Sequence, residues 1–142
     1  MKRLNCLLAV FTLMVLCFGF SGCGDPDDDD GNGGVNSGLV GTWERRYGTY
    51  QTETLVLGRD GSYKCIDYME GHYSKNKYYE SSTDTDKGSF SYNDATKILV
   101  INITNRNGSS CSYTRTYMVH TLETTKLVLL TTDGDSYYYN RK

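Results

Sequence analysis

Acid–base chemistry is the first activity that the residue types of this chain allow. Asp67, Glu70 and His72 lie close together in the segment IDYMEGHY, and a carboxylate beside an imidazole can transfer protons. His120 is the other histidine, and the sequence lacks the spacings of zinc hydrolases, nucleophile elbows and phosphate-binding loops. A polar loop after a strand accounts for the same three residues more simply. We therefore predict a protein that is not an enzyme and that holds no cofactor or metal ion.

Tyrosine is the residue type that points most directly to binding. All 13 tyrosines lie beyond position 46, and their flat, amphipathic rings are typical of binding surfaces. Consecutive tyrosines on a strand point to opposite faces, so part of each run lies outside the fold. Plain strand propensity explains the same runs, and both interpretations stay open. The candidate rings for contact with a ligand or partner are Tyr68, Tyr73, Tyr78, Tyr79, Tyr137 and Tyr139.

Residues 1–22 are typical of a lipoprotein signal peptide. Two basic residues precede an apolar run at positions 7–20, which is shorter than the roughly 20 residues that a membrane-spanning helix needs. An uncleaved N-terminal anchor is the alternative. The run ends in Ser-Gly-Cys, which resembles the bacterial lipobox. The resemblance implies that Cys23 carries acyl chains such as palmitate, becomes the new N-terminus and anchors the protein in outer-membrane lipid.

Residues 23–38 follow as an acidic, glycine-rich tether. Five aspartates repel one another and extend the segment, and four glycines make its second part flexible. An acidic run after an acylated cysteine resembles the surface-export signal of some Gram-negative lipoproteins. The resemblance implies exposure at the cell surface, with a periplasm-facing position as the alternative.

The negative charge of the chain resides in this tether. The full sequence has 15 Lys and Arg against 17 Asp and Glu. Without the two basic residues of the signal and the five aspartates of the tether, 13 positive residues face 12 negative ones. The remaining domain is close to neutral and has no basic stripe, so we expect no nucleic-acid partner.

Two cysteines, Cys65 and Cys111, remain beyond the tether. An even pair in an oxidising compartment is consistent with a disulfide, which would contribute about 4 kcal/mol in the chain-entropy treatment. Two free thiols packed as small apolar side chains are the alternative. Both interpretations stay open.

Residues 39–142 read as one small domain built of strands. The segment is dense in Thr and Tyr, and Asp-Gly or Asn-Gly turns separate its apolar runs. The fourth strand has the weakest pattern and can instead belong to a loop over residues 70–87. The predicted strands are 42–49, 52–58, 62–69, 74–80, 87–92, 97–104, 111–120, 125–132 and 136–141.

Alternation along these strands indicates which side chains face the core. About eight sequential antiparallel strands with short turns predict an all-β fold, a single small up-and-down β-barrel that leaves no open edge. A β-sandwich fits the same pattern and is the alternative. The predicted inward residues are Leu55, Leu57, Tyr63, Cys65, Phe90, Tyr92, Leu99, Ile101, Ile103, Leu127 and Leu129.

Three segments of this domain carry a family resemblance. LVGTWERRY, at 39–47, opens a strand with Gly-x-Trp, and LVLGRDGSY and TKLVLLTTDGDSYYY have the form of hairpins. Together they resemble the lipocalin family, and in particular the small lipocalin-like domain lipoproteins of Gram-negative bacteria. The resemblance implies that Gly41 and Trp43 pack at one barrel end, and that Arg141 lies over the tryptophan in a cation–π contact.

Two functions are possible for such a barrel, and they differ in whether its interior is filled by side chains or empty. Eight strands enclose a space that is either filled by side chains or just wide enough for one small ligand. We predict a membrane-anchored lipoprotein that binds a small apolar or glycan-like ligand without catalysis. The alternative is a packed barrel that acts as a protein–protein interaction or accessory subunit of a cell-envelope complex.

Overall fold

The computed structural model describes residues 37–142, and every regular element in this part is a β-strand. The predictions for the signal peptide, for Cys23 and for the acidic run lie outside the described residues. Between residues 37 and 142 there is no helix with the length and apolar character that a membrane crossing requires. The strands are β1 (Gly41–Tyr47), β2 (Gln51–Leu57), β3 (Ser62–Met69), β4 (His72–Ser74), β5 (Lys77–Tyr79), β6 (Ser82–Asn93), β7 (Ile98–Arg106), β8 (Ser109–Leu122), β9 (Lys126–Thr131) and β10 (Ser136–Arg141).

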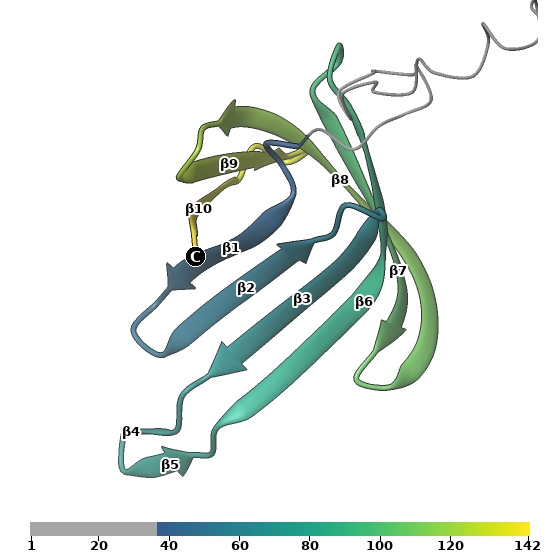
Figure 1. Cartoon of the computed structure of the whole chain (residues 1–142). Helices are drawn as coiled ribbons and strands as arrows, with labels where there is room; N and C mark the ends of the chain where they lie inside the picture. The colour runs from purple at the N-terminus through teal and green to yellow at the C-terminus, as the bar shows by residue number, and fades with distance from the viewer. Residues whose placement is uncertain (1–36) are drawn as a thin grey trace, which may run out of the picture. The chain divides into compact units, whose positions relative to one another are not determined.

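Eight of these strands form a closed antiparallel barrel (Figure 1). Each barrel strand pairs with the next barrel strand along the chain, and β3 therefore pairs with β6. The pairing of β1 with β10 closes the sheet. This confirms the predicted up-and-down barrel, and the alternative of a β-sandwich is wrong. Closure leaves no unpaired edge in the barrel.

The prediction of one strand at 74–80 is wrong. In its place β4 and β5 form a separate two-stranded hairpin that projects beyond the ends of β3 and β6 (Figure 1). Lys75 and Asn76 both have positive φ, at 47° and 64°, which gives the two-residue turn that suits a tight hairpin. After the hairpin, β6 begins at Ser82 rather than at the predicted residue 87.

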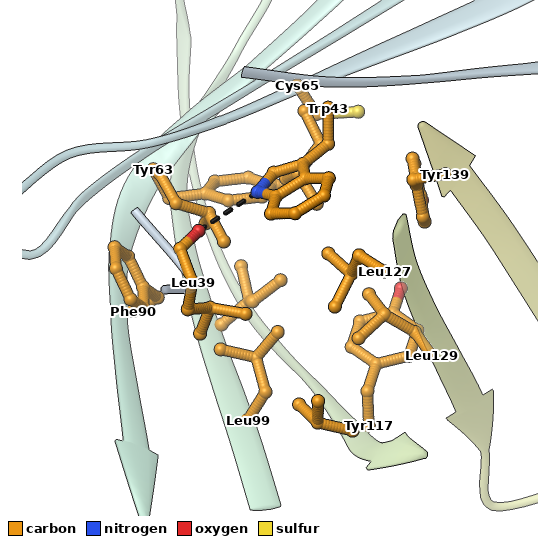
Figure 2. Close-up of a cluster of buried hydrophobic side chains, with 14 of the residues drawn as sticks. Leu39, Trp43, Tyr63, Cys65, Phe90, Leu99, Tyr117, Leu127, Leu129 and Tyr139 are labelled. Carbon is orange, nitrogen blue, oxygen red and sulfur yellow. Dashed lines mark hydrogen bonds between the residues drawn. The ribbon is translucent and has the colours of Figure 1, made fainter. Parts of the chain in front are cut away.

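The core lies inside the barrel and follows the predicted alternation. Figure 2 shows its side chains converging from several strands, with the indole of Trp43 among them. All the predicted inward residues are buried except Tyr92, which is partly buried and packs against the cluster. The core also includes Leu39, Trp43, Tyr117, Val119 and Tyr139.

A β-bulge brings β6 and β7 unusually close at Gly88. The register of the two strands shifts between Lys87 and Gly88. A Cβ atom added at Gly88 would overlap the carbonyl oxygen of Asn102 and lie 2.9 Å from its carbonyl carbon. The bulge therefore depends on the absence of a side chain at this position.

Candidate functional site: a charged cavity at the open end of the barrel

One end of the barrel is closed by Trp43 and Arg141. The Trp43 side chain is fully buried, and its Nε1 donates a hydrogen bond to the carbonyl oxygen of Leu39 at 2.9 Å (Figure 2). Arg141 is the register partner of Trp43 across β1 and β10, and its guanidinium carbon lies 4.2 Å from the centre of the indole ring system. A cation over an indole face is favourable, and more so where water is excluded.

Arg141 also ties together three segments at this end. Its guanidinium donates to the carbonyl oxygens of Thr124, Val40 and Gly38 at 2.6, 3.0 and 2.6 Å. Gly41 has a φ of 149°, and a Cβ there would lie 2.5 Å from Arg141 Nη1. The glycine therefore gives the guanidinium the room that it occupies. Gly41, Trp43 and Arg141 therefore form one packed unit.

The opposite end of the barrel holds a cavity of about 730 Å³. The side chains around it come from all eight barrel strands and from the turn between β9 and β10. Charged groups predominate: three arginines and five carboxylates border the space. The lining residues are Arg45, Tyr47, Glu53, Cys65, Asp67, Asp84, Asp86, Arg106, Thr114, Arg115, Thr116, Tyr117, Thr131, Thr132, Asp133 and Tyr137.

One row of this lining runs across four adjacent strands in register. Arg45 of β1 stands opposite Glu53 of β2, Glu53 opposite Asp67 of β3, and Asp67 opposite Asp84 of β6. Each of these residues has the same parity as the buried core residues of its strand, because side chains alternate between the two faces. On these strands the inward-facing side chains are therefore apolar near the closed end and charged near the open end.

Arg45 and Glu53 form a largely buried ion pair in the cavity wall. Arg45 donates from Nε and Nη2 to the two carboxylate oxygens of Glu53, at 3.1 and 3.0 Å. The guanidinium lies 4.0 Å from the ring centre of Tyr137, and the Tyr139 hydroxyl donates to Glu53. Burial alone would lower the pKa of Arg45, but the hydrogen bonds to Glu53 raise it above its usual value. Arg45 therefore stays positively charged in the wall of the cavity.

A second cluster is centred on the buried carboxylate of Asp86. It accepts hydrogen bonds from Nε and Nη2 of Arg106, both at 2.7 Å, and from the hydroxyl of Tyr113 at 2.8 Å. The hydrogen bonds from Arg106, followed by that from Tyr113, hold the pKa of Asp86 below its usual value. Arg115 Nη2 lies farther away, 3.6 Å from Asp86 Oδ2.

The structure separates the predicted tyrosines into two groups. Tyr137 lines the cavity, and Tyr139 is buried beneath it. Tyr68, Tyr73, Tyr78 and Tyr79 are exposed, the last three on the β4–β5 hairpin, where Tyr73 reaches 76 % exposure. Tyr73 and Tyr78 pair across the hairpin with ring centres 4.9 Å apart.

The residues of the acid–base segment do not converge. Asp67 lines the large cavity, whereas His72 borders a separate hollow of about 320 Å³. There the His72 ring stacks between Tyr50 and Tyr79, with ring centres 4.1 and 5.2 Å apart. His120 lines another hollow of about 920 Å³, which Arg141 also borders. Within residues 37–142, no group of three or more His, Cys, Asp or Glu side chains could hold a metal ion.

Both cysteines of the domain are free thiols in the structure. Cys65 lies on β3 and Cys111 on β8, and β6 and β7 separate these strands in the sheet. They are therefore not cross-strand neighbours, which would bring Cβ atoms within reach of a disulfide. Of the two interpretations left open by the sequence, the structure has the free thiols. Burial raises the pKa of Cys65 to about 12, which leaves the thiol protonated and unreactive.

The charged residues of the cavity were missed from the sequence. Arg45, Glu53, Asp84, Asp86, Arg106 and Arg115 read as ordinary solvent-exposed side chains of strands or turns. The signal that marks them is parity: Arg45 follows Trp43 by two residues, and Glu53 precedes Leu55 by two, so both fall on the inward face.

Comparisons with protein families, with curated proteins and with solved structures found no match for this chain. A function for it therefore follows from the cavity and from the sequence motifs.

Proposed function

We propose that this protein is a membrane-anchored lipoprotein whose barrel binds a small, polar, glycan-like ligand without catalysis. The observation that carries the proposal is the cavity of about 730 Å³ at one end of a barrel whose other end is closed. Its volume lies within the range of about 300–1,000 Å³ that small-molecule sites have. One closed end means that a ligand enters and leaves through a single opening.

The lining of the cavity favours a polar ligand over an apolar one. An apolar molecule would strip water from the charged groups of the wall without replacing its hydrogen bonds, which is costly. Sugar hydroxyls can donate to carboxylates such as Asp67 and Asp84 and accept from guanidinium groups. The Tyr137 ring adds a flat face at the same wall. Of the two ligand classes predicted from the sequence, the glycan-like one suits this lining.

The anchoring part of the proposal is supported by the sequence. Small residues before Cys23 resemble a lipobox, and acyl chains on that residue would hold the protein in outer-membrane lipid, with exposure at the cell surface as the proposed orientation. The packing of Gly41, Trp43 and Arg141 supports membership of the lipocalin-like lipoproteins.

A protein-binding role is the second candidate, and the β4–β5 hairpin favours it. This hairpin stands outside the barrel and exposes Tyr73 and Tyr78, which are 76 % and 52 % exposed. Exposed tyrosines are typical of protein interfaces. An accessory subunit of an envelope complex would use this hairpin and would keep its cavity free of ligand.

Native mass spectrometry of the protein, purified gently from its own host, tests the ligand proposal. We expect an extra mass that is lost under denaturing conditions. Tyr137→Ala removes a ring from the cavity wall and should abolish the extra mass. Tyr138→Ala removes the neighbouring ring, which is 61 % exposed on the outer face, and should retain it. An apo mass for the wild type, or equal retention by both variants, would contradict the proposal and favour the protein-binding role.

Membrane fractionation tests the anchor. Cys23→Ala removes the acylation site, so we expect the protein to move from the membrane to the soluble fraction. Cys17→Ala is the matched control, because bulky Leu16 precedes that cysteine and the lipobox pattern is absent there. Membrane retention of Cys23→Ala would show that another segment anchors the chain.

A further inference from the structure

We propose that Arg115 selects the ligand of the cavity, and that this ligand is an acidic sugar whose single carboxylate pairs with the Arg115 guanidinium. The inference rests on the proposed function, since it names the chemical class that the same cavity takes. It follows from an uneven distribution of charge between the cluster around Asp86 and the carboxylates that border it in the cavity wall.

The cluster of Asp86, Arg106 and Arg115 carries one positive charge that no carboxylate within the cluster neutralises. Arg45 is neutralised by Glu53 and Arg106 by Asp86, each through two hydrogen bonds of the guanidinium to the carboxylate. Asp86 accepts a third bond from the Tyr113 hydroxyl. Two positive groups, Arg106 and Arg115, thus share the single charge of Asp86.

Arg115 is the weakly bound member of this cluster. Its closest approach to Asp86 is 3.6 Å, which exceeds the length of a hydrogen bond. Among residues 37–142, it is the cavity arginine that makes no bidentate pair with a carboxylate. A planar guanidinium has five N–H donors in a fork that fits a carboxylate, so Arg115 can bind a ligand carboxylate in place of its long contact with Asp86.

Arg115 lies on the inward face of β8, and its side chain is 38 % exposed, so a ligand in the cavity can reach the charge. Arg115 is the register partner of Ile101, a core residue that is 2 % exposed. On β6, Asp86 is one inward-facing position closer to the closed end than Asp84. A carboxylate that reaches Arg115 is therefore the leading end of the ligand.

The carboxylates that border this cluster explain why the rest of the ligand should be a neutral sugar. Asp67 and Asp84 stand directly opposite each other, and Asp133 also borders the opening. Asp84 accepts a hydrogen bond from Asn107 Nδ2 at 2.6 Å, and an amide brings no positive charge. Carboxylates here can accept hydrogen bonds from sugar hydroxyls, whereas a second negative charge would be repelled. A monoanion is thus favoured over a phosphate dianion.

Isothermal titration calorimetry of the detergent-purified full chain with matched sugars tests this inference. The probes are glucuronic acid, glucose and glucose 6-phosphate. We expect glucuronic acid to bind at least tenfold more tightly than glucose and than glucose 6-phosphate. In Arg115→Gln, its affinity should fall at least tenfold, to that of glucose, while the affinity for glucose stays within twofold.

The control for charge is Arg46→Gln. Arg46 lies on the outer, exposed face of β1, so this change lowers the net charge equally and should leave the affinity for glucuronic acid unchanged. Arg115→Lys keeps the charge but loses the fork, and we expect it to restore part of the affinity.

The possible results distinguish a failure of the role proposed for Arg115 from a failure of the proposed ligand-binding function. Equal binding of glucuronic acid and glucose to the wild type, or full affinity in Arg115→Gln, overturns the role of Arg115 while the cavity remains a sugar site. Tighter binding of glucose 6-phosphate overturns the carboxylate in favour of a phosphate. Binding of no sugar overturns the acidic-sugar assignment, and an apo mass in native mass spectrometry then removes the ligand-binding function as well.

Discussion

Trp43→Ala should lower the free energy of unfolding by about 3–5 kcal/mol, as large-to-small changes of aromatic core residues do. The indole is fully buried, packs under the Arg141 guanidinium and donates its N–H to Leu39. Truncation would leave a cavity and an unpartnered carbonyl oxygen at the closed end. Because Trp43 is the single tryptophan of the chain, denaturant unfolding should be followed by circular dichroism rather than by tryptophan fluorescence.

The control for Trp43→Ala is Tyr138→Ala. Tyr138 is an exposed aromatic residue of β10, and its removal should change the stability by about 0.5 kcal/mol or less. If Trp43→Ala unfolds at the wild-type denaturant concentration with an unchanged slope, the indole does not hold the closed end together.

Gly88→Ala should be the most damaging of the small substitutions, with a loss of about 3 kcal/mol or more. The added methyl group would overlap the Asn102 carbonyl oxygen and lie 3.0 Å from Ile103 Cα, and both atoms belong to the backbone of β7. A backbone cannot rotate aside as a side chain does, so β6 and β7 would have to separate at the bulge. Thermal and denaturant unfolding measure this loss.

Gly108→Ala tests whether a glycine effect alone explains such a loss. Gly108 has a φ of 85° and no atom within 4 Å of its added Cβ, so its cost is limited to backbone strain of about 1–2 kcal/mol. Equal stability of the two variants would mean that β6 and β7 are not in close contact at Gly88.

The barrel could be predicted because most of its strands alternate strictly between apolar and polar residues. Leu55 and Leu57, or Ile101 and Ile103, fix both the strand and its buried face, since a shift by one residue would expose the whole set. The turn at Asn107 and Gly108 could be predicted as well, because both residues have the positive φ values that Asn-Gly adopts in tight hairpins.

The charged lining of the open end could not be predicted, because its inward-facing residues are polar like those on an outer surface. The first part of β6 reads Ser-Thr-Asp-Thr-Asp, and its inward residues are Asp84 and Asp86 rather than apolar side chains. A strand whose inner face is charged resembles a loop in sequence. The ion pairs depend on register between strands, as for Asp86 and Arg106, which are 20 residues apart. A single sequence does not reveal which strands become neighbours.

The chain enters and leaves the barrel at the same pole, and this sets the direction from which the cavity is reached. Gly38 and Arg141 are hydrogen-bonded to each other, and the backbone N–H of Lys142 donates to the Thr42 carbonyl at 2.9 Å. The entrance of the cavity is at the other pole. Any restraint on the chain ahead of residue 37 therefore acts on the sealed pole. In the proposed anchored protein, a ligand would therefore exchange at the pole opposite to the attached one.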